Sequence, residues 1–540
     1  MFSRRLSLSL FFIGVAVAAL WEVASRGQAP TFGRVLLDRF APPPIERGIN
    51  PTEARAPDSR ETIRRLSIRT ATGVADRVGA FGASYRPGRV IVKFKDEAST
   101  PSRLSALAAS SRTASMSQRP SYADFDLVQI DPNEDAEAVA GTLSRRSDVE
   151  YAQAAYRVHP LFVPNDPNYK DQWSLPLIGM ERAWDIQPAA GSSIIVAVID
   201  TGIAYTPAAF KVHASAFQFD ADGNINPPGA PGTIGPVYPA LGDLTLSFVM
   251  APQLGPASPF VTPHDFIWDD NLPLDLDGHG THVSGTIGQL TNDGAGTAGV
   301  AFNVKLMPVK VLDSVWDDVL GAPNFATDDV VARGIRYAAD NGAKVLNLSL
   351  GRTGPPSPVM EDAVKYAVGK GAFIAIAAGN DFETGNQTGV LAEIASRVQG
   401  AVSVAAVDRG KAHAYYSTSG SWVELAAPGG SFRGYGASGG ILQQTLDLDL
   451  VETYALGVSK FTAPRFDVFA PFWFTGTSQA APHVAGLAAM MMQQGITDPA
   501  AVEAALERFA TDLGDPGRDP LFGFGLIEAR NALRGLGLAK

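Results

Sequence analysis

The chain has 540 residues, of which 46% are hydrophobic and 18% charged, so it can bury a sizeable core and is not disordered as a whole. Its net charge of −11 and the absence of a basic segment argue against a nucleic-acid partner. It contains no cysteine, which excludes disulfides and thiolate metal sites.

The first 25 residues have the pattern of an export signal. Arg4 and Arg5 precede an apolar run at 6–20, and small residues follow at 23–25. The run is shorter than the roughly 20 apolar residues that a membrane span needs. We therefore expect an exported protein, secreted or periplasmic, whose residues 1–25 form a signal peptide. The alternative is an uncleaved N-terminal anchor, and we expect membrane association only in that case.

Residues 26–85 predict a disordered linker, because they show Pro-rich and mixed charged stretches without lasting periodicity. Residues 86–160 predict a small α+β domain, a βαββαβ-like module that folds as a separate unit. Its expected strands and helices alternate along the chain: strands Arg89–Phe94, Phe125–Ile130 and Val149–Val158, and helices Pro101–Ser111 and Asp135–Leu143.

Residues 161–175 predict an exposed link rich in Pro, Asn and Asp, a natural place for a proteolytic cut. After residue 191, apolar strands alternate with helices, which predicts an α/β fold with a parallel sheet covered by helices on both faces. The expected strands are Ser193–Ile199, Val304–Leu312, Ala343–Leu350, Ala372–Ala377 and Ala401–Val407, and the expected helices are Asp328–Asn341, Pro358–Lys370 and Ala480–Met492.

Four polar residues stand at these expected strand ends and helix starts: Asp200, His279, Asn380 and Ser478. Active groups in parallel α/β folds lie at the carboxyl ends of strands. Singly, each residue has a plain structural explanation, and Ser478 is first of all a candidate helix N-cap. His279 and His282 are spaced three apart, yet no third ligand and no HExxH motif accompany them, so a catalytic metal is not expected and metal ligands stay unknown.

Together these residue types match the needs of nucleophilic catalysis. A serine hydroxyl attacks only when a base takes its proton, and an imidazole can do so near neutral pH. A carboxylate orients the imidazole, and an amide N–H beside the serine N–H stabilises the oxyanion. Asp200, His279 and Ser478 are therefore the candidate catalytic residues, with Asn380 as the oxyanion residue.

The sequences around these residues resemble those of the subtilisin-like serine proteases, the subtilases. VAVIDTGI around Asp200, DGHGTHVSGTIG around His279, AAGN around Asn380 and GTSQAAPHVAG around Ser478 are similar to four blocks of that family, in the family's order. The resemblance covers about residues 165–540, the expected catalytic domain, and residues 86–160 resemble the family's propeptide. It implies a serine endopeptidase made as a self-processing precursor, cut near residues 156–170, with the propeptide as folding helper and intramolecular inhibitor.

The resemblance also implies how a polypeptide substrate binds. Ser349, Leu350 and Gly351 match the edge strand that pairs with an extended substrate, and such pairing gives affinity with little sequence preference. The segment Ala377, Ala378 and Gly379 matches the wall of the pocket for the residue before the cut, and its small side chains leave room for a large apolar one.

Several features depart from the compact members of the family. Two insertions are expected, near 211–264 and 431–472, and within the first the sequence DADGN at 220–224 predicts a hairpin turn. Arg352 follows Gly351 and is expected to narrow the cleft, to favour acidic substrate residues, or to point to solvent.

The resemblance requires no cofactor for the chemistry but leaves a structural calcium ion open. Gln172 and the loop Leu290–Gly296 are similar to parts of the family's tight calcium site, although Ala208 and Ala209 stand where its carboxylate is expected. A group of acidic residues before the histidine block is a second candidate: Asp265, Asp269, Asp270 and Asp275.

Two competing interpretations remain for the whole chain. One is a catalytically silent scaffold that binds through the insertions, against which the four intact blocks argue. The other is a membrane-anchored processing protease with few substrates. The sequence leaves the natural substrates and the oligomeric state undetermined.

Overall fold

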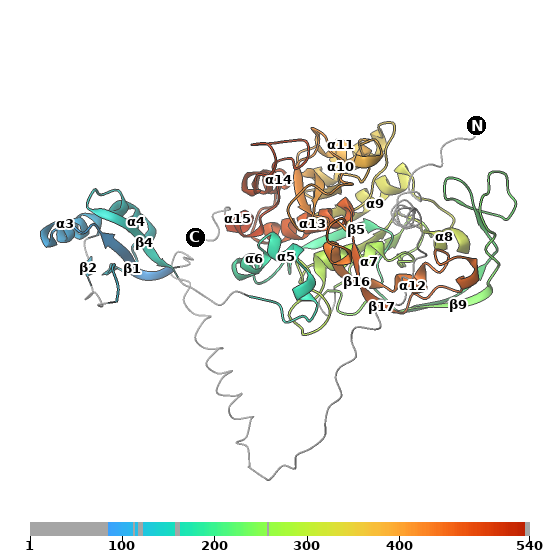
Figure 1. Cartoon of the computed structure of the whole chain (residues 1–540), viewed down its shortest axis with the longest axis horizontal. Helices are drawn as coiled ribbons and strands as arrows, with labels where there is room; N and C mark the ends of the chain where they lie inside the picture. Colours follow the sequence, from blue (N-terminus) through green and yellow to red (C-terminus); the bar gives the residue numbers. More distant parts are fainter. Residues whose placement is uncertain (1–84, 112–113, 117–121, 157–161, 256–258, 535–540) are drawn as a thin grey trace, which may run out of the picture. The chain divides into compact units, whose positions relative to one another are not determined.

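The computed structural model describes residues 85–111, 114–116, 122–156, 162–255 and 259–534. The expected signal peptide or anchor at 1–25 and nearly all of the expected linker at 26–85 lie outside these residues. The described residues fall into two compact units, residues 85–156 and residues 162–534 (Figure 1). Within these ranges no helix is both long and apolar enough to cross a membrane.

The small unit is a four-stranded antiparallel sheet with two helices, in the sheet order β2-β3-β1-β4. Alternate residues of β1 (Val90, Val92 and Phe94) point into a core shared with Leu107 and Leu143 of the helices, because side chains alternate between the faces of a strand. This confirms the expected βαββαβ order and adds a short strand, β2. The bounds are β1 Tyr85–Phe94, α3 Thr100–Ser110, β2 Ser115–Met116, β3 Asp126–Gln129, α4 Ala136–Ser144 and β4 Val149–Tyr156.

The large unit is built on a seven-stranded sheet in the order β10-β11-β5-β12-β13-β14-β15, in which all pairs are parallel. The expected α/β fold with a parallel sheet is confirmed, and β10 and β15 are strands that the sequence pattern did not reveal. The strands are β5 Ile195–Asp200, β10 His264–Asp265, β11 Lys305–Lys310, β12 Val345–Leu348, β13 Phe373–Ala377, β14 Ala401–Val407 and β15 Leu425–Pro428.

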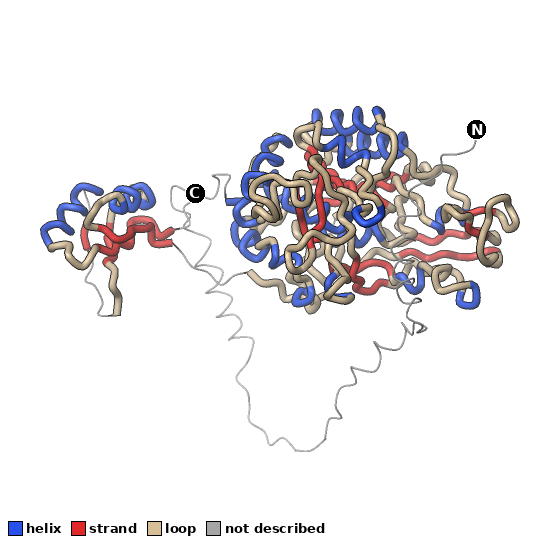
Figure 2. Tube along the Cα trace, turned by 45° about the horizontal axis from the view of Figure 1, so that its top comes forward, coloured by secondary structure: helices blue, strands red, loops and turns tan. Residues whose placement is uncertain are grey.

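Helices cover both faces of this sheet (Figure 2). Val196 and Val198 of β5 pack into the cluster that includes α7 and α13, whereas Ala197 and Ile199 pack into the cluster that includes α9, α10 and α11. Burial on both faces explains why the strands are apolar at nearly every position. The helices are α7 His279–Gly288, α13 Thr477–Gln493, α9 Asp328–Asp340, α10 Pro358–Gly369 and α11 Val390–Ala395, with α5 Ser174–Leu177, α6 Met180–Ile186, α14 Pro499–Phe509 and α15 Ala529–Arg534 on the periphery.

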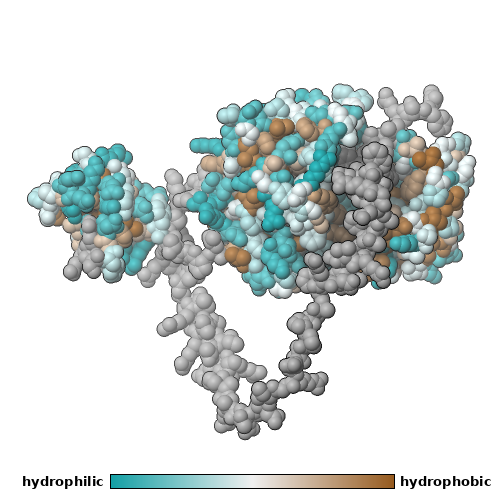
Figure 3. Space-filling view, in the orientation of Figure 1, coloured by the Kyte–Doolittle hydropathy of each residue, from teal (hydrophilic) through white to brown (hydrophobic). Residues whose placement is uncertain are grey.

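The two insertions, 211–264 and 431–472, pack against each other, and we call this part the insertion lobe. The ring of Phe248 stacks on Phe466 with centroids 4.9 Å apart, and Phe217 and Tyr238 contact Phe461. Figure 1 shows β9 and α12 beside α8 at one end of the large unit, and Figure 3 shows hydrophobic residues on its surface there. The elements of the insertion lobe are β6 Ala208–Ala214, β7 Gln218–Phe219, β8 Ile225–Asn226, β9 Gly242–Phe248, β16 Ile441–Leu446, α12 Leu448–Val451 and β17 Phe469–Phe474. Helix α8 Val315–Leu320 lies outside the two insertions and packs against β6 and β8.

The expected turn at 220–224 is confirmed, since it joins the antiparallel strands β7 and β8. The carboxylate of Asp220 accepts hydrogen bonds from the backbone N–H groups of Asp222 (2.9 Å) and Asn224 (2.8 Å). A carboxylate that closes its own turn in this way explains the acidic motif without a metal ion.

The stacking of Phe248 on Phe466 predicts that the insertion lobe depends on this contact. Phe466→Ala should lower the free energy of unfolding by about 3–5 kcal/mol, because it empties a buried aromatic site. The measurement is urea unfolding in a Ser478→Ala background, which prevents self-digestion. Val458→Ala, an exposed change in the same insertion, should change the value by less than about 0.5 kcal/mol. Equal effects of the two changes would contradict the proposed packing.

Candidate active site

Asp200 and His279 form a buried hydrogen-bonded pair at the carboxyl end of the sheet. Asp200 is the last residue of β5 and His279 the first of α7, and Asp200 Oδ1 lies 2.7 Å from His279 Nδ1. The side chains are 0% and 3% exposed. Gly280 makes this approach feasible, because a Cβ there would stand 2.0 Å from the carbonyl oxygen of Gly202.

The surroundings of His279 favour its protonated form. Burial lowers the pKa of the imidazole, but the charge and hydrogen bond of Asp200 more than offset this, so the pKa of His279 lies above its ordinary value. Asp277 and Asp275 act in the same direction more weakly. Burial, with the neighbouring Asp275, also raises the pKa of Asp277 to about 6.

Ser478 is the second residue of α13, and the N-cap is Gly476. The expectation that Ser478 itself caps the helix is therefore wrong, because the side-chain acceptor at the helix start is Asn380, which follows β13. Asn380 Oδ1 accepts a hydrogen bond from the backbone N–H of Thr477 at 2.9 Å and from its hydroxyl at 3.0 Å. Among the described residues, no hydrogen bond involves the backbone N–H of Ser478.

A reciprocal pair of hydrogen bonds joins Ser478 to Ser349. The Ser478 hydroxyl donates to the Ser349 carbonyl oxygen (3.1 Å), and the Ser349 hydroxyl donates to the Ser478 carbonyl oxygen (2.7 Å). That carbonyl would normally receive the N–H of residue 482, but Pro482 has none. Ser349 thus satisfies the acceptor that the proline leaves open, and the helix start is fixed to the end of β12.

Asn380 presents its amide nitrogen next to Gly476. A backbone N–H can only donate, so the atom of Asn380 that faces Thr477 is the oxygen, and the NH₂ group points the other way. A Cβ on Gly476 would lie 3.4 Å from Asn380 Nδ2 and 2.8 Å from Gln479 Oε1. The glycine therefore leaves space beside the amide donor and the helix start.

The sheet brings all four candidate residues to one edge. Val198 of β5 pairs with Asn347 of β12, so Asp200 and Ser349, each two residues further on, stand at the same level on neighbouring strands. Asn380 follows β13, the next strand, and α13 packs against α7. Asp200 is hydrogen-bonded to His279, Asn380 to the residue before Ser478, and Ser478 to Ser349.

The two expected substrate segments lie where their strands end. Ser349–Leu350–Gly351 continues beyond β12, which lies between β5 and β13 in the sheet, and the segment itself is outside the strand. Gly351 is exposed, and no hydrogen bond among the described residues involves the backbone of Leu350 or Gly351. Ala377 ends β13, and Ala378 and Gly379 follow it.

The side chain of Arg352 does not point freely to solvent. Its guanidinium forms a two-point ion pair with Asp328, with distances of 2.6 and 2.5 Å, and also donates to the carbonyl oxygen of Pro355 (2.9 Å). The sequence could not show this, because the partner lies at the start of α9. Arg352 therefore fixes the loop after Gly351.

His282 holds the insertion lobe rather than a metal ion. Its Nε2 lies 3.1 Å from the carbonyl oxygen of Ile441 and 3.2 Å from that of Phe472, and its ring stacks on Phe474 with centroids 4.1 Å apart. Carbonyl oxygens only accept, so Nε2 carries the proton. Burial lowers the pKa of His282 to about 3, which keeps the ring neutral.

Gln172 and the loop Leu290–Gly296 do not fit a calcium ion. The oxygen of Gln172 accepts the N–H of Ala298 at 2.7 Å. The nearby carboxylate of Asp166 accepts the N–H groups of Asn292 (2.7 Å) and Asp293 (3.2 Å). These oxygens face hydrogen-bond donors, and a cation needs oxygens that face it.

Three of the four acidic residues before the histidine block accept hydrogen bonds from nearby donors. Asp265 Oδ1 accepts the N–H groups of Ile267 and Trp268, and Asp270 accepts that of Leu272. Asp275 accepts hydrogen bonds from five donors along residues 201–281. Asp269 follows in a turn with positive φ. These carboxylates shape the loop that leads to His279.

Three residues of the site were missed from the sequence. Thr477 links Asn380 to Gly379, whose N–H donates to its hydroxyl at 3.1 Å. Thr201 donates its N–H to Asp200, and Lys310 donates to the carbonyl oxygen of Thr201. Only Lys310 left a signal in the sequence, since it is a charged residue within the apolar strand VKLMPVKVL.

The fold and the grouped Asp, His, Asn and Ser define the class of α/β serine hydrolases. The sequence-family model described as "Subtilase family" matches residues 191–525. The sequence-family model of the fervidolysin N-terminal prodomain matches residues 73–154. The chain therefore belongs to the subtilase family of serine proteases and carries an N-terminal prodomain. Enzymes of this family need no cofactor for their chemistry.

Two related proteases agree with this assignment. The chain is 30% identical to a thermophilic serine proteinase of Bacillus sp. (strain AK1), over 89% of this chain and 94% of that protein. It is 30% identical to an extracellular protease of Xanthomonas campestris pv. campestris, over 79% of this chain and 69% of that protein. A solved protease structure from Pseudoalteromonas arctica is 27% identical, with a TM-score of 0.49, and the match covers 70% of this chain and 100% of that one.

The Asp200–His279 pair predicts a specific change in the titration of the imidazole. Asp200→Asn should lower the pKa of His279, because it removes the carboxylate that favours the imidazolium. The measurement is an NMR titration of ¹⁵N-labelled histidine in a Ser478→Ala background. Asp277→Asn is the control and should lower the pKa less. A larger effect of the control, or no effect of Asp200→Asn, would contradict the pairing.

Proposed function

We propose that this chain is an exported serine endopeptidase that hydrolyses peptide bonds through an acyl-enzyme on Ser478. The observation that carries the proposal is the buried 2.7 Å hydrogen bond between Asp200 and His279, at the edge of the sheet that also holds Ser478. In the neutral form of His279 the proton sits on Nδ1, facing Asp200, so Nε2 has the lone pair that serves as the base.

In the proposed reaction the Ser478 hydroxyl turns from the Ser349 carbonyl toward His279, which takes its proton as the oxygen attacks the substrate carbonyl. The N–H of Ser478 and the NH₂ of Asn380 stabilise the oxyanion, helped by the positive end of α13. His279 then gives the proton to the leaving amine. Water, activated by the same imidazole, releases the acyl group from Ser478.

Polypeptides are the proposed substrates. The unpaired backbone of Leu350 and Gly351 is positioned to pair with an extended peptide, which gives affinity with little dependence on sequence. Ala377, Ala378 and Gly379 form the proposed wall of the pocket for the side chain before the cut. Their small size favours large apolar residues there.

The proposal includes a precursor stage. The small unit is the proposed intramolecular inhibitor, in keeping with the prodomain that its sequence matches. Its removal by a cut near residues 156–170 would be carried out by the enzyme itself. The extracellular protease among the relatives supports export, with residues 1–25 as the signal peptide.

Self-processing is tested with Ser478→Ala. This variant should accumulate as the uncut precursor, because no nucleophile remains to cut the link. Mass spectrometry of both purified proteins, after incubation with a peptide library, gives the processing site and the cleavage preference. Val458→Ala serves as a processed control. Normal maturation of purified Ser478→Ala would contradict self-processing, and a mature N-terminus within residues 1–25 would indicate the anchored alternative.

The role of Asn380 is tested with two variants that separate its two contacts. Asn380→Ala should lower kcat by about 10²–10³-fold, because one oxyanion donor is lost. Asn380→Asp keeps an oxygen acceptor for Thr477 but lacks the NH₂ group, so it should lose at least as much activity while unfolding at nearly the wild-type urea concentration. If Asn380→Asp retained wild-type kcat, Asn380 would be only a helix cap.

A further inference from the structure

A row of charged residues lies across three neighbouring strands beneath the site. Asp265 of β10 pairs with Lys310 of β11, and Lys310 pairs with Asp200 of β5. Residues in register on parallel strands point to the same face of a sheet. All three are buried, with exposed fractions of 1%, 0% and 0%.

Lys310 makes two short hydrogen bonds from its ammonium group. Nζ lies 2.7 Å from the carbonyl oxygen of Thr201 and 2.9 Å from Oδ2 of Asp317. Burying an ammonium costs several kcal/mol unless it is well paired. Two of its three donors are paired here, and one of the two partners is the backbone of the residue after Asp200.

Thr201 connects the two halves of the Asp–His pair. Its N–H donates to Asp200 Oδ1 (2.8 Å), and its hydroxyl accepts the N–H of Gly280 (2.9 Å), the residue after His279. The same hydroxyl donates to Asp275 (3.0 Å). Lys310 therefore holds, through one carbonyl, the residue that sets the distance between the carboxylate and the imidazole.

We propose that Lys310 is a positioning residue for the catalytic pair: it fixes Thr201, and through it the Asp200 carboxylate, and its charge offsets part of the negative field at His279. This rests on the proposed function for the consequences in catalysis. The hydrogen-bonded geometry of Asp200 and His279 does not depend on the proposed function.

Helix α8 connects Lys310 to the insertion lobe. Asp317, the partner of Lys310, also accepts the indole N–H of Trp268 (2.7 Å). The neighbouring Trp316 donates to the carbonyl oxygen of Val451 (2.7 Å) and stacks on Phe461 with centroids 6.0 Å apart. The insertion lobe thus contacts α8 through Trp316, and α8 carries Asp317, the carboxylate that pairs with Lys310.

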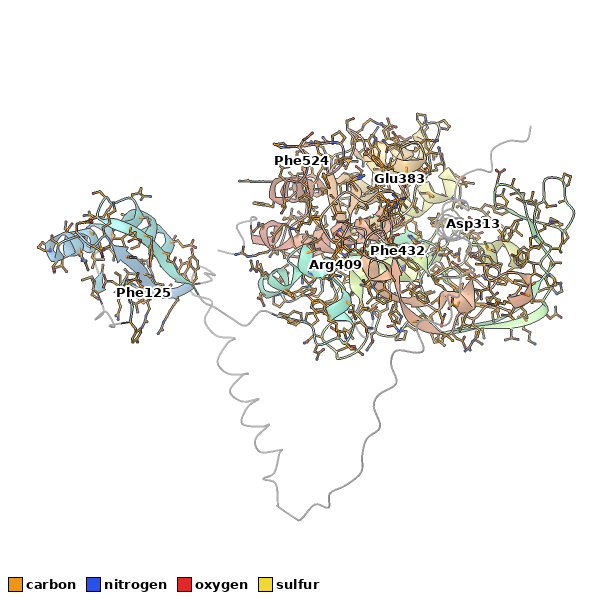
Figure 4. All side chains as sticks on the ribbon, viewed as in Figure 1. Phe125, Asp313, Glu383, Arg409, Phe432 and Phe524 are labelled. Carbon is orange, nitrogen blue, oxygen red and sulfur yellow. The ribbon has the colours of Figure 1, made fainter. Side chains whose placement is uncertain are left out.

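The ammonium of Lys310 lies between the Thr201 carbonyl oxygen and the Asp317 carboxylate. The carboxylates that act on it come from β10, the loop before α7, and α8: Asp265, Asp275 and Asp317. Asp313, labelled in Figure 4 just before α8, also interacts with Lys310. Burial raises the pKa of Asp265 to about 7, so the charges that Lys310 offsets are mainly those of Asp200, Asp275 and Asp317.

Two substitutions test the proposal in opposite directions. Lys310→Met removes the charge and the contact to Thr201. It should lower kcat per active site by about 10–100-fold with KM within about twofold, and it should move the acid limb of the pH profile to higher pH, because a more negative field favours the imidazolium. Asp317→Asn keeps the shape and should move the acid limb to lower pH. Lys305→Met, an exposed change on the same strand, should change neither.

The double variant separates charge from contact. Lys310→Met with Asp317→Asn restores the net charge but not the hydrogen bond to Thr201. Its acid limb should return near the wild-type position while kcat stays low. Rates are measured on processed enzyme after titration of active sites with a fluorophosphonate. Wild-type kcat and an unmoved acid limb in Lys310→Met and Asp317→Asn would overturn the proposal.

A readout that does not need activity distinguishes failure of this inference from failure of the proposed function. In a Ser478→Ala background, Lys310→Met should shift the proton resonance of His279 Nδ1–H, since the bond to Asp200 changes. If Lys310→Met does not fold, Asp317→Asn in the same background should still lower the pKa of His279. If the resonance and the pKa of His279 were unchanged in both variants, Lys310 would not position the Asp200–His279 pair, even if the wild type cleaves peptides.

Discussion

The start of helix α13 is fixed to the ends of two neighbouring strands, and the rest of the site depends on this junction. Ser349 at the end of β12 exchanges two hydrogen bonds with Ser478, and Asn380 after β13 accepts the N–H of Thr477. Buried polar groups that lose their partners cost about 1–3 kcal/mol each. The helix start therefore cannot slide relative to the sheet without losing several such contacts at once.

This junction places the proposed nucleophile, the Ser478 N–H and the Asn380 amide with one set of contacts. Pro482 has a part in it, because its missing N–H leaves the Ser478 carbonyl for Ser349. The opposing half of the site is held differently, by the buried charges around Asp200. The insertion lobe contacts this half of the site through α8, which carries the partner of Lys310. The two insertions therefore support the proposed catalytic edge and do not merely extend the surface.

Much of the fold followed from the sequence because local patterns determine it. The strand Ala401–Val407 was predicted with its observed bounds, since burial on both faces makes every residue of it apolar. The sequence also predicted the positions of Asp200, His279 and Asn380 relative to the strands and helices. Each follows directly from the apolar strand or the helix pattern beside it. The short strands β2 and β10 escaped notice, because two residues carry no periodicity.

Other features depend on contacts between residues far apart in the chain. Ser478 was expected to cap α13, but the cap at Thr477 comes from Asn380, and no local pattern shows that. The partner of Arg352 lies at Asp328, and the calcium-like loop is closed by Asp166. The insertions gave no sign of packing on each other, since aromatic residues such as Phe248 and Phe466 find their partners only in the folded chain.

The central claim is that the junction at the sheet edge makes Ser478 a nucleophile activated by His279. The most direct measurement is reaction of the processed protein with a fluorophosphonate, with the adduct located by mass spectrometry and its rate followed against pH. The account predicts a single adduct on Ser478, formed faster as the pH rises through the pKa of His279. Absence of an adduct on Ser478 in the processed protein, or a rate independent of His279→Ala, would contradict it.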